Sequence, residues 1–200
     1  MDALETLELI KPSIAYGPQY LAMVAEHVEA GEGYGYNNID LAREDFAAFV
    51  RELEEEAQGI GLPEGFPAQQ TYFLVKDRQM VMGEIRFRSN LTPPYEKFSG
   101  HIAYNIRPSQ RGQGYATRQL ALLLEEARKL HLPFVTLTVE DENPASVRVI
   151  QKNGGTLSRI VEDPLGVRVK DVDGKLVSED FKRSNVRLAL YCIEIAPDLS

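Results

Sequence analysis

Residues 106–117, Ile-Arg-Pro-Ser-Gln-Arg-Gly-Gln-Gly-Tyr-Ala-Thr, constrain the fold of this chain more than any other stretch. Residues 99–106 before it are strand-compatible, and Pro108 helps to end that strand because it has no N–H to donate to a ladder. Apolar residues then recur at helical spacing, at Leu120, Leu123, Leu124, Ala127 and Leu130. The pattern predicts a strand, a glycine-bearing turn and a helix in direct succession.

Such a turn is suited to binding an anion. Gly112 and Gly114 allow backbone conformations that other residues resist, and they let a ligand approach the bare main chain. The first N–H groups of the following helix have no partner within it, and the helix dipole is positive there, which favours a phosphate or pyrophosphate. Arg107, Arg111 and Arg118 add positive charge. The alternative is a turn whose glycines serve geometry alone; neither a P-loop nor a complete G-x-G-x-x-G is present, because Thr117 stands at the third glycine position.

A second motif lies downstream. The strand-like run 134–139 leads to Asn143-Pro144-Ala145-Ser146 and then to Lys152-Asn153-Gly154-Gly155. Together the two motifs resemble the GCN5-related N-acetyltransferase (GNAT) superfamily. Its Arg/Gln-x-x-Gly-x-Gly/Ala loop matches Arg111 to Ala116, and its Asn followed by a short helix ending in Lys-x-Gly matches Asn143 to Gly154. The resemblance covers residues 80–160 well and the rest only by the order of elements.

The resemblance implies acetyl-CoA as co-substrate and places its contacts. The backbone of three strand residues would follow the pantetheine arm: Tyr104, Asn105 and Ile106. The pyrophosphate would lie in the loop formed by Arg111, Gly112, Gln113, Gly114, Tyr115 and Ala116. The Thr117 hydroxyl would support the helix start, and Asn143 and Ser146 would lie near the cofactor. Asn143 is also a good N-cap for the short helix, and the two roles are compatible.

Composition restricts the class of protein. With 44% apolar and 26% charged residues in 200, the chain is predicted to be one globular domain spanning residues 1–200. A net charge of −8 argues against a nucleic-acid partner and weakly favours a cationic or amine substrate. The chain has one cysteine, Cys192, and it shows neither a signal-peptide pattern nor a long apolar run. These features predict a cytoplasmic protein without a membrane partner. Three scattered histidines and one cysteine predict no metal site.

The element order predicts an α+β fold, with a mixed, mostly antiparallel central sheet flanked by helices, as in the GNAT superfamily. Strands are predicted at 7–10, 70–76, 79–88, 99–106, 134–139, 156–161 and 188–195, the last closing the sheet, with hairpin turns at Asp77-Arg78 and 171–174. Helices are predicted at 18–30, with a stripe that includes Leu21 and Val28, and at 41–58, capped by Asp40. Pro93-Pro94 is predicted to be extended. The helix after residue 114 makes the flanking strands locally parallel.

Amine acetylation needs a neutral amine. Freeing the lone pair of an aliphatic amine with a pKa near 10.4 costs about 4 kcal/mol at neutral pH, so a general base is expected. His101 and Glu84 are the candidates for this base. The alternative interpretations are that His101 is packed within the sheet and that Glu84 is an exposed surface carboxylate. Tyr191 is the candidate proton donor, set against a packing role. The superfamily often places a tyrosine on the short helix for the departing thiolate, and Ile150 stands there in this chain.

The leading functional prediction is an acyl-CoA-dependent N-acetyltransferase in which a primary amine attacks acetyl-CoA directly within a ternary complex. The missing tyrosine motivates an alternative, a non-catalytic acyl-CoA-binding sensor or interaction module. A dinucleotide-binding domain is disfavoured, because repeated βαβ units are absent. The sequence does not identify the acceptor amine, since fold does not fix substrate. The loop 31–38 is either a connector or a substrate wall, and segment 162–187 is a candidate for the acceptor pocket or a homodimer contact.

Overall fold

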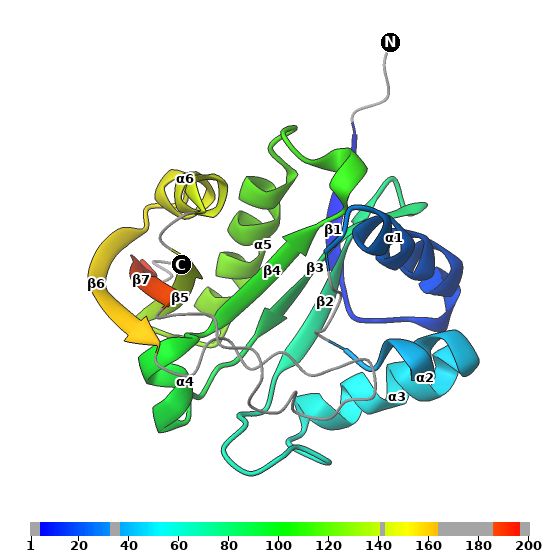
Figure 1. Cartoon of the computed structure of the whole chain (residues 1–200), viewed down its shortest axis with the longest axis horizontal. Coiled ribbons are helices and arrows are strands. Elements are labelled where there is room, and N and C mark those ends of the chain that lie inside the picture. The colour runs from blue at the N-terminus through cyan, green and yellow to red at the C-terminus, as the bar shows by residue number, and fades with distance from the viewer. Residues whose placement is uncertain (1–4, 33–36, 141–142, 164–185, 197–200) are drawn as a thin grey trace.

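The structure of the chain, a computed structural model, describes residues 5–32, 37–140, 143–163 and 186–196 (Figure 1). The loop tyrosines at 34 and 36, the hairpin expected around 167–177 and most of segment 162–187 lie outside these ranges. The strands are β1 (Leu7–Ile10), β2 (Gln70–Lys76), β3 (Met80–Phe87), β4 (Ile102–Ile106), β5 (Phe134–Glu140), β6 (Thr156–Asp163) and β7 (Val186–Glu194). The helices are α1 (Gly17–Glu29), α2 (Ile39–Glu44), α3 (Phe46–Ala57), α4 (Pro93–Phe98), α5 (Tyr115–Lys129) and α6 (Pro144–Lys152), with short 3₁₀ turns at Ile14–Tyr16 and Pro108–Gln110.

The seven strands form one mixed sheet in the order β1-β2-β3-β4-β5-β7-β6. Every neighbouring pair is antiparallel except β4 and β5, which are parallel across the α5 crossover. This confirms the predicted mostly antiparallel sheet. The prediction that the last strand closes the sheet is wrong: β7 lies between β5 and β6, and β6 is the edge. Leu188, Ala189 and Leu190 are buried in succession, which is typical of a strand covered on both faces.

Helices cover both faces of the sheet. In Figure 1, α1, α2 and α3 lie on one side, and α5 and α6 lie on the other. The core on the first side is aromatic and aliphatic and includes Tyr20, Met23, Phe49 and Phe73. The core on the second side joins α5 and α6 to the strands and includes Leu120, Leu123, Leu137, Ile150 and Tyr191.

The helical stripe of α1 is displaced from the prediction. Its buried face carries Tyr20, Met23, Val24 and His27, at the i, i+3, i+4, i+7 spacing of one helix face, whereas Val28 is 55% exposed. A histidine therefore occupies a core-facing position that hydrophobicity alone would not assign.

Three further local predictions are wrong and one is confirmed. The long helix predicted at 41–58 is two helices, because Asp45 is in an extended conformation and caps α3 by accepting from the N–H of Ala48 at 2.9 Å. The N-cap of the first of these helices is Asn38, which accepts from the N–H of Leu41 at 3.2 Å, and not Asp40, which lies within the first turn. Pro93-Pro94 begins helix α4, since proline fits the first turn of a helix, where the N–H has no partner. The hairpin turn is confirmed: Asp77 and Arg78 have φ of 51° and 56°, as a type I′ turn between β2 and β3 requires.

None of the helices in the part of the chain that the structure describes has the length and apolarity needed to cross a membrane.

Replacing Asp45 tests the break between α2 and α3. We expect Asp45→Ala to lower the free energy of unfolding by about 1 kcal/mol, because the first turn of α3 loses its capping acceptor. Asp40→Ala is the matched control: Asp40 makes an exposed ion pair with Arg43 at 3.3 Å, and its loss should change stability by less than about 0.5 kcal/mol. Urea unfolding measures both, and equal effects would contradict the assignment of the cap.

Candidate functional site

The parallel strands β4 and β5 separate to leave a wedge in the sheet. Only Ile102 and Leu137 are paired between them, whereas β4 is paired with β3 through five residues, from Ile102 to Ile106. The backbone edge of β4 beyond Ile102 therefore faces no strand partner among the described residues. Main-chain N–H and C=O groups need partners, so this edge suits an extended ligand with amide groups.

At the head of the wedge, the loop between β4 and α5 presents bare main chain. Gly112 and Gly114 have φ of 77° and 85°, and a Cβ built on either would meet no atom within 4 Å. Within the described residues, the N–H groups of residues 112–117 donate no hydrogen bond, and the first helical bond of α5 runs from Arg118 N to Gly114 O at 3.2 Å. Gly114 occupies the N-cap position, where no side chain competes for these donors. The loop fits a diphosphate in both space and polarity.

The second motif begins α6 on the other side of the wedge. The Asn143 side chain accepts from the N–H of Ser146 at 3.0 Å, so Asn143 is an N-cap. The Tyr104 hydroxyl reaches the Ser146 carbonyl at 3.5 Å, and burial raises the pKa of this tyrosine. The structure thus brings β4 and the start of α6 together at the wedge, although they lie some forty residues apart in sequence.

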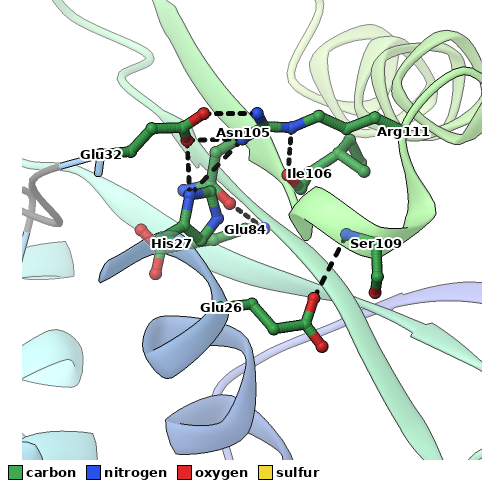
Figure 2. A network of polar contacts seen from close by, with 8 residues as sticks. All are labelled: Glu26, His27, Glu32, Glu84, Asn105, Ile106, Ser109 and Arg111. Carbon is green, nitrogen blue, oxygen red and sulfur yellow. Dashed lines mark hydrogen bonds and ion pairs between the residues drawn. The ribbon is translucent and has the colours of Figure 1, made fainter. Parts of the chain in front are cut away.

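The charges of the arginines around the loop are balanced within the chain, which the sequence did not predict. Figure 2 shows this for Arg111. Arg111 forms a two-pronged ion pair with Glu32, at 2.5 and 2.6 Å, and donates from Nε to the Ile106 carbonyl at 3.1 Å. Glu32 also contacts His27 Nδ1 at 2.9 Å. Glu26 pairs with Arg107 at 2.6 Å and accepts from the N–H of Ser109 at 3.2 Å.

The third arginine is engaged in the same way at the opposite side of the loop. Arg118 pairs with Glu5 at 2.6 Å, and Glu5 also accepts from Lys76 and from the Tyr115 hydroxyl, each at 2.9 Å. No sequence pattern links Glu5, Glu26 or Glu32 to the loop, because the contacts span 79 to 113 residues. Attraction of an anion to this loop therefore depends chiefly on main-chain donors and the helix dipole.

Glu84 lies in a buried polar cluster beside the wedge. It was expected at the surface, yet it is 1% exposed, because α1 and the residues before α2 cover it. Its carboxylate accepts from the Tyr20 hydroxyl at 3.0 Å and from Asn37 Nδ2 at 2.8 Å, and it forms an ion pair with Arg86. The N–H of Glu84 donates to Asn105 Oδ1 at 3.2 Å, across the β3–β4 ladder.

This cluster borders a cavity of about 10 Å³, the room for one water molecule. The cavity is lined by Glu84, Arg86, Ala103, Tyr104 and Asn105, so it opens on the unpaired half of β4. Tyr20, Asn37 and Arg86 were not predicted as site residues. The alternation of residues along β3 places Arg86 on the same face as Glu84. Asn37 belongs to the loop 31–38, for which the sequence left a substrate wall open.

His101 is held by the neighbouring strand. Its Nδ1 accepts from the N–H of Thr136 at 3.0 Å and lies 2.8 Å from the Thr136 hydroxyl. An N–H can only donate, so the network assigns the proton of the neutral ring to Nε2. Burial, followed by the charge of Arg88, lowers the pKa of His101 below its usual value. The ring is therefore neutral at pH 7, with its lone pair directed at Thr136.

The remaining two positions lie in the core of the α5 side. Tyr191 is 6% exposed and pairs with Leu137 across β5 and β7. Ile150, at the position of the superfamily's tyrosine, is 1% exposed, and Gly155 packs so tightly against it that an added Cβ would lie 2.3 Å from Ile150 Cγ2. No group of three metal-ligating side chains is found among the residues that the structure describes.

Comparisons with known proteins agree with this geometry. The sequence matches the family described as "Acetyltransferase (GNAT) domain" over residues 11–156, so the chain belongs to the GNAT acetyltransferase family, whose co-substrate is acetyl-CoA. A search of curated protein sequences finds no significant match.

Solved structures share the fold at low sequence identity. The ribosomal-protein-S5-alanine acetyltransferase of Vibrio fischeri is 11% identical with a TM-score of 0.64, covering 98% of this chain and 95% of its own. The yncA protein of Salmonella typhimurium, solved with its cofactor acetyl-CoA, is 15% identical with a TM-score of 0.58, covering 99% and 100%. The microcin C7 self-immunity acetyltransferase MccE, in complex with acetyl-CoA and AMP, is 14% identical with a TM-score of 0.64, covering 94% and 92%.

The Arg111–Glu32 ion pair makes the free energy of unfolding depend on pH in the acidic range. Hydrogen bonding to Arg111 lowers the pKa of Glu32 from its ordinary value of 4.5 to about 2. Because the pKa of Glu32 is lower in the folded state than in the unfolded state, this carboxylate stabilises the fold at pH values above its unfolded-state pKa. The stabilisation is lost as the pH falls through its folded-state pKa. Between about pH 6 and pH 2.5, the wild type should therefore lose more stability than Glu32→Gln, by at most about 1 kcal/mol because the Glu32 side chain is 42% exposed.

Denaturant unfolding at several pH values measures this difference. Glu54→Gln is the matched control, since Glu54 is an exposed residue of α3, and its pH dependence should follow that of the wild type. Identical slopes for Glu32→Gln and the wild type would show that the ion pair contributes nothing in solution.

Proposed function

We propose that this protein is an acetyl-CoA-dependent N-acetyltransferase that transfers the acetyl group to a primary amine by direct attack within a ternary complex. The observation that carries the proposal is the loop of residues 111–117, with its open main-chain donors at the head of the β4–β5 wedge. Membership of the GNAT family supports acetyl transfer, and the yncA and MccE structures were solved with acetyl-CoA.

We assign the donor contacts by position in the site. The N–H groups of Gly112, Gln113, Gly114, Tyr115, Ala116 and Thr117 would hold the diphosphate. The unpaired edge of Tyr104, Asn105 and Ile106 would pair with the pantetheine amides, and Asn143 and Ser146 would border the cofactor from α6. Arg111 lies beside the same loop and is 44% exposed, so it can exchange Glu32 for a phosphate oxygen without moving far.

The chemistry that the site has to perform is amide formation. The amine nitrogen attacks the thioester carbonyl, a C–N bond forms, the C–S bond breaks, and the electron pair leaves with sulfur. The amine loses one proton in the process. Thiols have a pKa near 8.5, so the departing thiolate is a comparatively stable anion that needs no dedicated proton donor. The position of Tyr191 inside the core is compatible with that assignment.

We assign proton removal to Glu84, acting through a water molecule in the cavity it borders. Its carboxylate is an acceptor fixed by Tyr20 and Asn37, at the point where the wedge opens. His101 is the weaker candidate, because its Nδ1 lone pair is already used by Thr136. We assign His101 a positioning role, in which it holds β4 to β5 just before the strands separate.

The alternative, an acyl-CoA-binding sensor without turnover, is favoured by one observation. Ile150 is packed against Gly155, so the usual tyrosine is absent and no space is left for one. Release of free thiol in a mixture of the protein, acetyl-CoA and an amine panel separates the two. Tight acetyl-CoA binding with no thiol release for any amine would favour the sensor.

Gly112→Ala tests the loop. The added methyl group would fill the space above the main chain, and we expect the dissociation constant for CoA to rise roughly tenfold or more, the value of one lost charge-assisted hydrogen bond. Gly61→Ala is the matched control, because Gly61 has φ of 73° and also has no neighbour within 4 Å, but lies far from the loop. Both variants carry the same backbone strain. Calorimetry should show weaker CoA binding for Gly112→Ala alone, and equal affinities would refute the assignment.

Glu84→Gln tests the base. It keeps the side-chain shape but removes proton acceptance, so we expect kcat to fall roughly a hundredfold with the KM for acetyl-CoA unchanged. The deficit should narrow as the pH approaches about 10, because the amine then loses its proton unaided. A deficit that stays constant with pH would indicate a structural role for Glu84 instead.

A further inference from the structure

Three charged residues alternate along the second half of β3 and the residue that follows it. Glu84, Arg86 and Arg88 lie two residues apart, so their side chains emerge on the same side at steps of roughly 6.7 Å. The ladder sets Asn105 opposite Glu84 and Ala103 opposite Arg86, and the Arg88 N–H donates to the His101 carbonyl at 2.9 Å. The row therefore follows the wedge from its open part to the point where β4 and β5 join.

The row carries one more buried cation than it has carboxylates. Glu84 pairs with Arg86, and both are nearly inaccessible, at 1% and 5% exposed. Arg88 is 7% exposed and has no carboxylate within ion-pair distance in the described part of the chain. It is held by the Gln69 side-chain oxygen at 3.1 Å, by the Gly100 carbonyl at 3.4 Å and by the ring of Tyr95, 4.9 Å from its guanidinium carbon.

A guanidinium in this position is energetically expensive. The Arg88 Nε is buried without a hydrogen-bond acceptor, and burial lowers the pKa of Arg88 to about 10, which still leaves it charged at neutral pH. Removing a cation from water without a counter-anion is unfavourable, and an unsatisfied buried donor adds to the cost. An anion entering this face would offset both, in a chain whose net charge is otherwise −8.

The cavity beside the row has room for one water-sized group, such as an ammonium. It is lined by the carboxylate of Glu84 and the guanidinium of Arg86, side by side. The ammonium of a ligand would take the place of that one water at Glu84, and a carboxylate on the adjacent carbon would stay at the mouth of the cavity and pair with Arg86. The surplus charge of Arg88, close behind Arg86, strengthens the anion site.

We propose that the acceptor is a primary amine that carries a carboxylate beside the amino group, as a free amino acid does. The proposal rests on the acetyltransferase function proposed above, and it names the class of acceptor. The ammonium first gives one proton to Glu84, and the neutral nitrogen then attacks the acetyl carbonyl. As the C–S bond breaks, the electron pair leaves with sulfur, the second N–H proton passes to the departing thiolate or to solvent, and the product is an N-acetyl amino acid. A protein N-terminus lacks this carboxylate, so the proposal separates the chain from its structural neighbours that act on ribosomal proteins.

The test compares three ligands that share one side chain: phenylalanine, phenylalaninamide and phenethylamine, with the other amino acids and their amides as a panel. Thiol release reports turnover, and calorimetry on the CoA-saturated protein reports binding. For the preferred amino acid, we expect kcat/KM to exceed that of its amide and of its decarboxylated amine by roughly ten- to a hundredfold. Equal rates for acid and amide would overturn the proposal and leave the acetyltransferase function intact.

Arginine variants connect the preference to the row. Arg88→Gln should raise the KM for the amino acid at least about tenfold and leave the KM for its amide within about twofold. Arg88→Lys keeps the positive charge, so it should raise the KM for the amino acid by less. Arg78→Gln is the control, because Arg78 has a 77% exposed side chain at the β2–β3 turn. An equal rise for acid and amide would show that Arg88 is structural, and should Arg88→Gln not fold, Arg88→Lys alone decides.

The outcomes separate the two proposals. If no amine is acetylated but an amino acid binds the CoA complex more tightly than its amide, the result supports recognition of an amino acid and refutes the acetyltransferase function. If no amino acid binds that complex in preference to its amide, the acceptor class is refuted. CoA binding, measured in the same experiment, reports on the loop independently.

Discussion

Between β4 and β5 the sheet is held by one residue pair, Ile102 with Leu137, and the two parallel strands separate beyond it. The separation leaves main-chain groups of β4 in need of partners and creates the wedge on which the site is built. His101 strengthens the junction through Thr136, immediately before the strands part. The loop to α5 then starts where β4 ends, so an extended ligand along β4 brings its anionic end to the helix N-terminus. One interruption in strand pairing thus places a backbone edge and an anion site in line.

Charge around the loop is balanced before any ligand arrives. Arg107, Arg111 and Arg118 are each paired with a glutamate from the N-terminal part of the chain. Unpaired arginines would attract anions of many shapes, whereas main-chain donors are fixed in direction and select by geometry. The pairing also ties α1 and the segment after it to the loop.

The buried row on β3 shows the opposite balance. Glu84 accepts from Tyr20 and Asn37 and pairs with Arg86, yet Arg88 adds a charge that the described residues do not neutralise. Buried ionic groups seldom stabilise a fold by themselves, which is why we propose a role in recognition for this row. Tyr20 donates to Glu84 and stacks on Phe73 with 4.8 Å between ring centroids, and this apolar surrounding strengthens the electrostatic interactions of Glu84.

Local signals in the sequence were enough for the strand–turn–helix unit, the Asn143 cap, the Asp77-Arg78 hairpin and the mostly antiparallel sheet. These depend on neighbours within a few residues: glycine at positive φ, an Asx cap and the alternation of apolar residues. Boundaries were missed where a single residue changed the outcome, as at Asp45 between α2 and α3 and at Pro93 starting α4. Only the tertiary structure decided the environment of the charged residues. Glu84 is buried because Tyr20 and Asn37, 64 and 47 positions away, close over it. The charges of the loop arginines are compensated by Glu5, Glu26 and Glu32, which are distant in sequence. Burial and ion pairing are set by contacts between distant segments, and no local pattern encodes them.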